Sequence, residues 1–298
     1  LLLIFPVLGY SQKNEITADQ AVEIAFRNNL GLKASAQRIN QSKQLLGSAI
    51  DIDKTEFYYS RDENNFAPNN IPLDVWGVSQ SFQFPTVYGA QRKVMQGESQ
   101  LVIDQYDMDK RMVAKEVYKS YYEIVYWQQM HQNYSYLDSL YTSFDHAANR
   151  RFEQGESNYL EKLTAETKKK EISLQLNQIL ESLRKSYLVL NQWLQTDTVF
   201  EVSDKQFERI ALTPLDTMNH PGVNYYDDAL KLSNRMLTLE KHKVLPDLNV
   251  SVFRGTNNGI GNQTYWGVEV GVAIPLWFGS QKSKIAAAKT DTYIMEYE

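Results

Sequence analysis

The stretch WGVEVGVAIPLWFGSQ, residues 266–281, has a counterpart in WGVSQSFQFPTVYGAQ, residues 76–91, at an offset of 190 residues. Both copies keep the opening Trp-Gly-Val, a proline nine residues after the Trp, a glycine four residues later and the final Gln. Over residues 76–84 and 266–274 the odd-numbered residues are mostly small or polar, and the even-numbered ones are apolar, with Gln80 as the exception. The apolar set comprises Trp76, Val78, Phe82, Phe84, Trp266, Val268, Val270, Val272 and Ile274. A period of two predicts a β-strand with one apolar face.

Two environments suit such a strand. A strand of roughly 10 residues is long enough to cross a membrane as part of a β-barrel. The same alternation is typical of a soluble sandwich strand with one buried face. The segments around the two copies must therefore decide between a membrane strand and a sandwich strand.

The composition removes several classes of function. The chain has 298 residues, a formal net charge of -5 and no cysteine. It therefore has no disulfides, no thiolate metal ligands and no cysteine nucleophile, and it lacks the basic surface expected of a nucleic-acid-binding protein. The mean hydropathy is -0.47, and no run reaches the roughly 18 apolar residues of a spanning helix. Entry into a membrane would have to use alternating strands.

The first eleven residues, LLLIFPVLGYS, begin with an apolar run. Gly9 and Ser11 then have the spacing of a small-x-small cleavage site. We interpret residues 1–11 as the remnant of a secretory signal whose basic beginning is missing. The alternative is the tail of a preceding segment in a longer polypeptide. A core helix is disfavoured by Pro6 and Gly9.

The segments between the two copies are helical in pattern. The capping box Thr17–Gln20 predicts the start of a helix, which would reach about Asp53 and be interrupted near Gly31. The residues after it predict a strand at 55–60 and a turn-rich loop at 61–72. Residues 91–150 read as one helix of about 60 residues, a turn at 150–158 follows, and a second helix extends to about Gln195. No single globular core accommodates such lengths. We therefore expect a long antiparallel helical hairpin of a coiled coil or helical tube.

The beginning of the chain also recurs. The sequence NHPG at residues 219–222 echoes NNLG at 28–31, and a helix, two strands and the start of a helix follow again. We predict an internal duplication in which residues 12–195 form the first repeat, 196–218 a connector and 219–298 an incomplete second repeat. Because position 298 falls inside a helix, we expect the chain to be part of a polypeptide about a third longer.

In this order, the motifs resemble the TolC-like outer-membrane efflux channel family. The resemblance covers nearly the whole chain from Thr17. The motifs that carry it are AVEIAFRNN (residues 21–29), RFEQG (151–155), NHP (219–221), LPD (245–247) and IPLWFG (274–279). The family implies a mainly α fold with β-strands, in which long helical hairpins form an α-barrel. Four transmembrane strands from each of three protomers close a twelve-stranded barrel in the outer membrane of a Gram-negative bacterium.

The resemblance also implies a function and partners. The protein would be the exit duct of a tripartite pump, a homotrimer with a periplasmic helical extension in contact with outer-membrane lipid. Its partners would be a periplasmic adaptor and an inner-membrane efflux transporter, separate or fused to it. The segment IPLWFGSQK is most similar to channels of heavy-metal-cation pumps; drug efflux and type I protein secretion stay open as alternatives.

Two sites follow from the resemblance. Arg151, Phe152 and Gly155 match the periplasmic hairpin tip where adaptors dock, although a helix C-cap glycine gives the same pattern. Glu161 aligns with the acidic gate position, where three carboxylates would form a ring that favours cations. A solvated glutamate on a helix surface is the plain alternative.

No enzymatic, cofactor or metal site is expected. The histidines His131, His146, His220 and His242 are too far apart in sequence for a metal motif, and His220 is expected to have a structural role at a helix start. No nucleophile elbow or phosphate-binding loop occurs. A rival from another class is a soluble coiled-coil adaptor or scaffold, against which the duplicated Trp-Gly-Val strands argue.

Overall fold

The computed structural model describes residues 15–66, 72–198, 200–207, 220–256, 261 and 263–297. The chain forms two compact units, one from residues 1–34 and 108–215 and the other from 35–107 and 216–298. The predicted signal remnant and most of the predicted connector lie outside the described residues. In chain order the elements are β1 (Glu15–Ile16), α1 (Ala18–Asn28), α2 (Leu30–Leu45), the 3-10 helix η1 (Leu46–Ala49), β2 (Glu56–Phe66), β3 (Pro72–Phe82), α3 (Pro85–Glu153), α4 (Tyr159–Leu194), β4 (Glu201–Val202), α5 (Pro221–His242), β5 (Asp247–Thr256), β6 (Thr264–Ala273) and α6 (Gly279–Tyr297).

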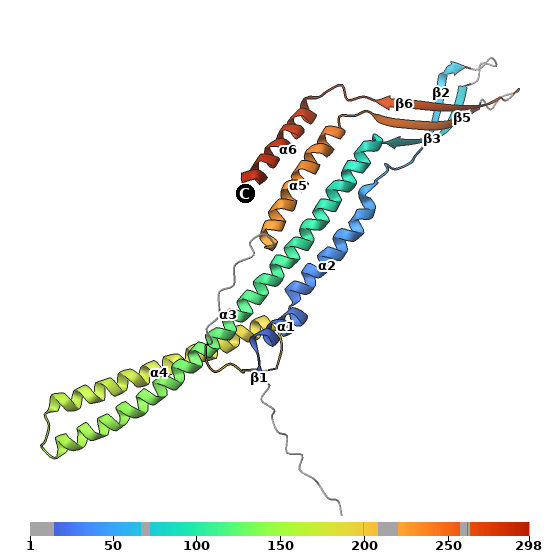
Figure 1. The fold of residues 1–298 in the computed structure, drawn as a ribbon. Helices are drawn as coiled ribbons and strands as arrows, with labels where there is room; N and C mark the ends of the chain where they lie inside the picture. Colours follow the sequence, from blue (N-terminus) through green and yellow to red (C-terminus); the bar gives the residue numbers. More distant parts are fainter. Residues whose placement is uncertain are drawn as a thin grey trace, which may run out of the picture. The chain divides into compact units, whose positions relative to one another are not determined.

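The first unit contains the predicted helical hairpin. The part of α3 beyond Met108 and the whole of α4 run back along one another (Figure 1). With 69 residues, α3 is longer than predicted and begins at Pro85 rather than Gln91. Proline is compatible with the first helical turn, where its missing N–H has no partner to lose. The prediction of two long helices is confirmed, and its N-terminal boundary was wrong.

The core of this unit joins α3, α4 and α1. Its largest fully buried side chains are Tyr121, Ile124, Leu190, Leu194, Val117 and Val125. The hydroxyl of Tyr121 donates a hydrogen bond to the carbonyl of Ile16 at 3.0 Å, which attaches α3 to a small parallel sheet of β1 and β4. β4 lies in the segment predicted as a connector, and no strand was predicted at β1, because a two-residue strand has no periodicity to detect.

The helix predicted for residues 17–53 is divided at Asn29, close to the predicted interruption. Asn29 Oδ1 accepts a hydrogen bond from the N–H of Leu32 at 3.0 Å and so caps α2. Asn28 Nδ2 donates to the carbonyl of Leu194 at 3.2 Å, at the end of α4. The two asparagines of the resemblance motif therefore have separate structural roles, one starting a helix and the other anchoring α1 to α4.

The second unit contains a four-stranded antiparallel sheet in the order β2-β3-β5-β6. β2 continues to Phe66, so the prediction that a loop begins at Arg61 was wrong. Arg61 and Asp62 pair with Asp74 and Leu73 of β3, so these polar residues belong to the sheet. β3 ends at Phe82 and β6 at Ala273. Phe84 and Ile274 were therefore wrongly included in the strands, because the prolines that follow them cannot continue a ladder.

Helices α3 and α5 enclose the apolar core of this unit. The buried cluster comprises Val87, Ala90, Val94, Leu232 and Leu239, with Phe84 and Leu101 packed against it. Phe84 thus serves the helical core. Gln281, the last residue of the repeated stretch, donates hydrogen bonds from Nε2 to the carbonyl and carboxylate of Glu240, at 2.8 and 2.9 Å. These bonds hold the start of α6 against α5.

One buried carboxylate in this unit lacks a full set of partners. Asp104 on α3 is 7% exposed, and within the described residues its Oδ2 has no hydrogen-bond partner. Burial raises the pKa of this carboxyl, Gln100 offsets part of the rise by donating a hydrogen bond, and the charge of Asp228 on α5 raises the pKa further. The folded state therefore binds this proton more tightly than the unfolded chain does.

Asp104→Asn is expected to stabilise the second unit at neutral pH. The stability contributed by the protonated carboxyl is complete below its ordinary pKa and is lost as pH rises through the raised folded pKa. The neutral amide removes this loss and can donate a hydrogen bond toward Asp228. We expect the free energy of unfolding to increase by about 1–3 kcal/mol at neutral pH. Thermal unfolding in detergent should therefore shift upward at neutral pH and little at acid pH. An equal shift for the exposed Asp107→Asn, or a larger shift at acid pH, contradicts this account.

Candidate functional site

One face of the sheet is apolar and is largely exposed among the residues that the structure describes. Directly opposed residues of antiparallel strands share a face, and the register aligns Phe57, Val78, Val252 and Val268 in one row. Trp266 is 73% exposed, and Val268 and Val270 are each 70% exposed. We call the following set the apolar sheet face: Phe57, Tyr59, Trp76, Val78, Phe82, Leu248, Val250, Val252, Trp266, Val268, Val270 and Val272. An apolar surface of this extent indicates a partner or a lipid environment.

The opposite face carries mostly small and polar side chains, together with the aromatic rings of Tyr58, Phe253 and Tyr265. We call the part of it away from the Tyr265 row the small-residue face: Glu56, Tyr58, Gly77, Ser79, Ser81, Asn249, Ser251, Phe253, Gly267, Glu269, Gly271 and Ala273. Tyr58 pairs with Gly77, and Phe253 pairs with Gly267. A Cβ atom at either glycine would overlap the facing ring. The glycine of each Trp-Gly-Val copy therefore makes space for an aromatic ring folded over the backbone.

The hairpin tip is a helix cap of well-defined geometry. Gly155 has a φ of +73°, and the N–H of Glu156 bonds to the carbonyl of Arg151 at 2.8 Å, the pattern of a Schellman cap. Phe152 packs edge-on against Tyr159 with ring centroids 6.0 Å apart. The interpretation of Gly155 as a C-cap glycine is therefore correct. The side chain of Arg151 is exposed, which leaves it accessible to a partner.

The structure brings the predicted tip and gate residues together. Arg151 on α3 and Glu161 on α4 line the same groove, with a volume of about 380 Å³. The other lining residues are Phe144, Ala147, Ala148, Ser157, Leu160 and Thr164. Glu161 is exposed and lies in the first turn of α4, where Asn158 Oδ1 accepts its N–H at 2.9 Å. A carboxylate in a first helical turn is stabilised by the helix dipole.

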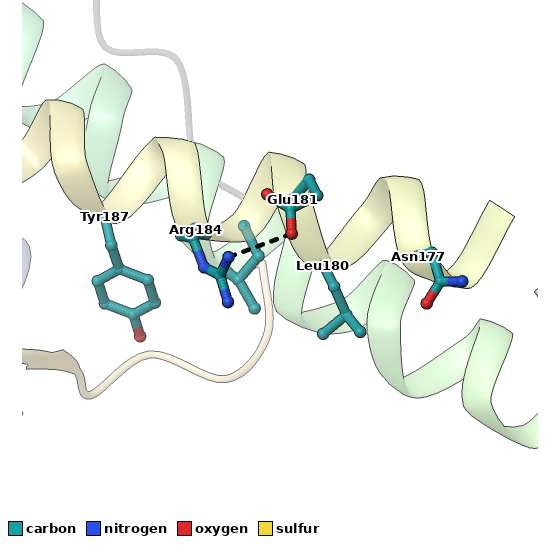
Figure 2. A pocket seen from close by; sticks show the side chains of 6 residues that line it. Asn177, Leu180, Glu181, Arg184 and Tyr187 are labelled. Carbon is teal, nitrogen blue, oxygen red and sulfur yellow. Dashed lines mark hydrogen bonds and ion pairs between the residues drawn. The ribbon is translucent and has the colours of Figure 1, made fainter. Parts of the chain in front are cut away.

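A second hollow lies on α4 alone. It has a volume of about 520 Å³ and is lined by Asn177, Leu180, Glu181, Leu183, Arg184 and Tyr187. In Figure 2 these side chains project from one helix, and Glu181 and Arg184 form an ion pair at 3.2 Å. Because a single helix lines it, this hollow is an open surface groove that does not enclose a ligand.

The described residues form no metal site, and one predicted histidine role is structural. Across the described ranges, no group of three or more His, Asp or Glu side chains has the geometry to hold a metal ion. His220 caps α5, since its Nδ1 accepts the N–H of Gly222 at 3.1 Å, which confirms its predicted structural role. Of the helices described, none is both long and apolar enough to span a membrane.

Solved structures share this architecture. CusC, described in terms of folding and transmembrane channel formation, aligns with a TM-score of 0.75 at 12% identity, covering 98% of this chain and 73% of its own. The CmeC outer membrane channel of Campylobacter jejuni gives 0.71 at 14% identity, covering 100% and 75%. The outer membrane protein VceC of Vibrio cholerae gives 0.70 at 12% identity, covering 94% and 74%.

These likenesses define the fold as that of the outer-membrane channels. More particularly, the fold is that of the TolC-like channels, as the sequence motifs predicted. No protein-family model matches the sequence, and no curated protein matches it either.

Sequence reasoning missed two features of the site. The first is the pairing of Tyr58 and Phe253 with the Trp-Gly-Val glycines. It could have been predicted by aligning the two strands of each hairpin antiparallel on either side of their loop. The second is Arg254, which the register places on the apolar sheet face between Trp76 and Trp266. Its position could not be predicted, because the pairing of β5 with β3 and β6 is set by strand register and not by sequence spacing.

Proposed function

We propose that this chain is a protomer of the outer-membrane exit duct of a tripartite efflux pump, and that it conducts substrate passively. The observation that carries the proposal is the apolar sheet face. β6 has 10 residues, about 33 Å of strand, which at a tilt of about 40° spans the roughly 25 Å apolar band of an outer-membrane protein. The apolar sheet face would meet lipid, and the small-residue face would line water.

Homotrimer formation is part of this proposal. Among the described strands, β2 and β6 each pair on one side only. Unpaired backbone groups at membrane depth cost several kcal/mol each, so strands in lipid must close into a barrel. Pairing β6 of one protomer with β2 of the next in three copies gives a twelve-stranded barrel, located in the outer membrane with the helices in the periplasm.

The hairpin tip is the proposed contact with a periplasmic adaptor. Arg151, Phe152 and Gly155 supply an exposed cation, a ring and a defined turn. The adaptor would connect the duct to an inner-membrane transporter, which supplies the energy. Heavy-metal cations are the proposed cargo, on the similarity of residues 274–282 to channels of that branch; drugs and secreted proteins are the alternatives. A soluble scaffold is disfavoured because it would leave the apolar sheet face in water.

The test is made on the full-length protein, expressed with its signal and extracted from outer membranes. Its mass in detergent and its single-channel conductance in planar bilayers are measured. A pore-forming trimer supports the duct. A water-soluble monomer or dimer without conductance overturns the proposal and leaves the coiled-coil scaffold as the leading function.

Glu161→Gln is expected to reduce the preference of the pore for cations. Three carboxylates in a ring concentrate cations, and the amide keeps the size and the cap of Asn158 while removing the charge. The reversal potential in a salt gradient should move toward zero, with the trimer unchanged. Glu156→Gln, a neutralisation at an exposed position in the nearby turn, is the matched control. An equal change in both variants would show that Glu161 is an ordinary surface carboxylate.

A further inference from the structure

A complete row of side chains crosses the apolar sheet face near the hairpin loops. The register aligns Tyr59, Trp76, Arg254 and Trp266 across all four strands. The next row away from the loops, from Phe57 to Val268, is wholly apolar, and the next row toward them contains Arg61, Asp74, Thr256 and Thr264. The aromatic row is thus the border between an apolar and a polar zone. Tryptophan and tyrosine favour this border at membrane surfaces.

Arg254 is the one charged member of this row. Its guanidinium lies over the Trp266 ring, with Cζ 6.0 Å from the ring centroid, and the side chain is exposed. No ion pair of Arg254 is found within the described part of the chain. The nearest acidic residue on the same face, Asp74, is diagonal to Arg254 and accepts the hydroxyl hydrogen of Tyr59 at 2.9 Å. The positive charge of Arg254 is therefore available to a ligand.

Arg254 lines a groove of about 490 Å³ together with Trp76, Trp266, Val78 and Val252 and with residues of β2. Trp76 and Trp266 lie on its two sides, and Val78 and Val252 continue it into the apolar zone. The groove thus offers a cation at one end and a hydrocarbon surface at the other. A lipid with an anionic head group has the matching distribution of charge and apolar surface.

We propose that Arg254, flanked by Trp76 and Trp266, binds the phosphate group of an outer-leaflet lipid whose acyl chains lie over Val252 and Val268. The inference rests on the proposed function, which places the helices in the periplasm and the hairpin loops at the cell surface. A guanidinium binds phosphate with two parallel hydrogen bonds, and the cation–π contact with Trp266 holds the Arg254 guanidinium at the border row. The lipid therefore seals this part of the sheet to the membrane.

The experiment uses the detergent-purified full-length protein and lipid A as the probe, in its phosphorylated form and after enzymatic removal of the phosphates. Bound lipid is counted by native mass spectrometry during a titration. The wild type is expected to bind the phosphorylated form about tenfold more tightly, the effect of a charge-assisted hydrogen-bonded contact. Arg254→Gln should lose this preference, and Arg254→Lys should keep only part of it. Arg184→Gln, which removes an equivalent charge from α4, should bind as the wild type does.

Equal binding of the two lipid forms by the wild type overturns the inference without any variant. Unchanged preference in Arg254→Gln overturns it as well. Trimer mass and conductance are recorded on the same samples. A conducting trimer without phosphate preference would refute the lipid site alone, whereas a protein that forms no pore would refute the proposed function and the lipid site together.

Discussion

Val270→Arg is expected to prevent the protein from accumulating in the outer membrane. Val270 lies in the middle of β6 on the apolar sheet face and is 70% exposed, so in the proposed duct it faces hydrocarbon. An arginine at the bilayer midplane costs about 2–4 kcal/mol in an outer-membrane barrel. Three protomers would each carry this cost, and the total is comparable with the entire stability of many folded domains.

The neighbouring residue provides a matched control. Glu269 lies on the small-residue face, so Glu269→Arg introduces the same side chain one position away on the side proposed to face water. This variant should insert, form trimers and shift ion selectivity toward anions. Outer-membrane fractionation and unboiled gel mobility measure insertion and assembly. If both variants insert equally, or if only Glu269→Arg fails, the assignment of the two faces is incorrect.

Arg151→Glu is expected to abolish export while leaving the pore intact. Arg151 is exposed at the hairpin tip. The helix cap at Gly155 uses the backbone carbonyl of Arg151, and the Arg151 side chain takes no part in it. Charge reversal should therefore spare the turn and act on the adaptor contact, where truncating a key interface residue commonly costs 2 kcal/mol or more. Cells that depend on this duct should lose resistance to the exported cargo, although conductance of the purified trimer stays normal.

The control is Arg184→Glu on α4. Arg184 forms an exposed ion pair with Glu181 (Figure 2), and breaking such a pair changes stability by less than about 1 kcal/mol. Export should continue in this variant. Crosslinking to the adaptor reads out docking directly. Normal crosslinking by Arg151→Glu, or equal loss of export in both variants, would exclude a specific docking role for Arg151.

The elements that could be predicted from the sequence are those with a clear periodic pattern of apolar residues. The hairpin of α3 and α4 follows from dozens of residues of helical pattern, and β3 and β6 follow from alternation. Sequence-based prediction of element boundaries failed where a proline or a run of polar residues controls the boundary. The cases are the start of α3 at Pro85, the extension of β2 past Arg61, and the strand ends before Phe84 and Ile274. Strand pairing extended β2 past Arg61, the first helical turn tolerated Pro85, and the prolines after Phe84 and Ile274 ended the two strands.

The candidate sites were predictable to different degrees. The tip turn could be predicted, because a glycine after a long helix commonly adopts the left-handed conformation that Gly155 has. The proximity of Arg151 and Glu161 in one groove could not be predicted from the sequence, because it depends on how α3 and α4 pack. The same holds for Arg254, whose neighbours on β3 and β6 are fixed by strand register rather than by sequence spacing.

The aromatic rings over Gly77 and Gly267 bear on the bore of the proposed duct. Tyr58 and Phe253 belong to the face that would line water, so three protomers would place six rings around the passage. A ring folded down onto a glycine occupies little of the cross-section, whereas a ring standing upright would narrow it. In the proposed duct, the glycines of the repeated stretch would therefore help to set the size of the largest cargo that can pass.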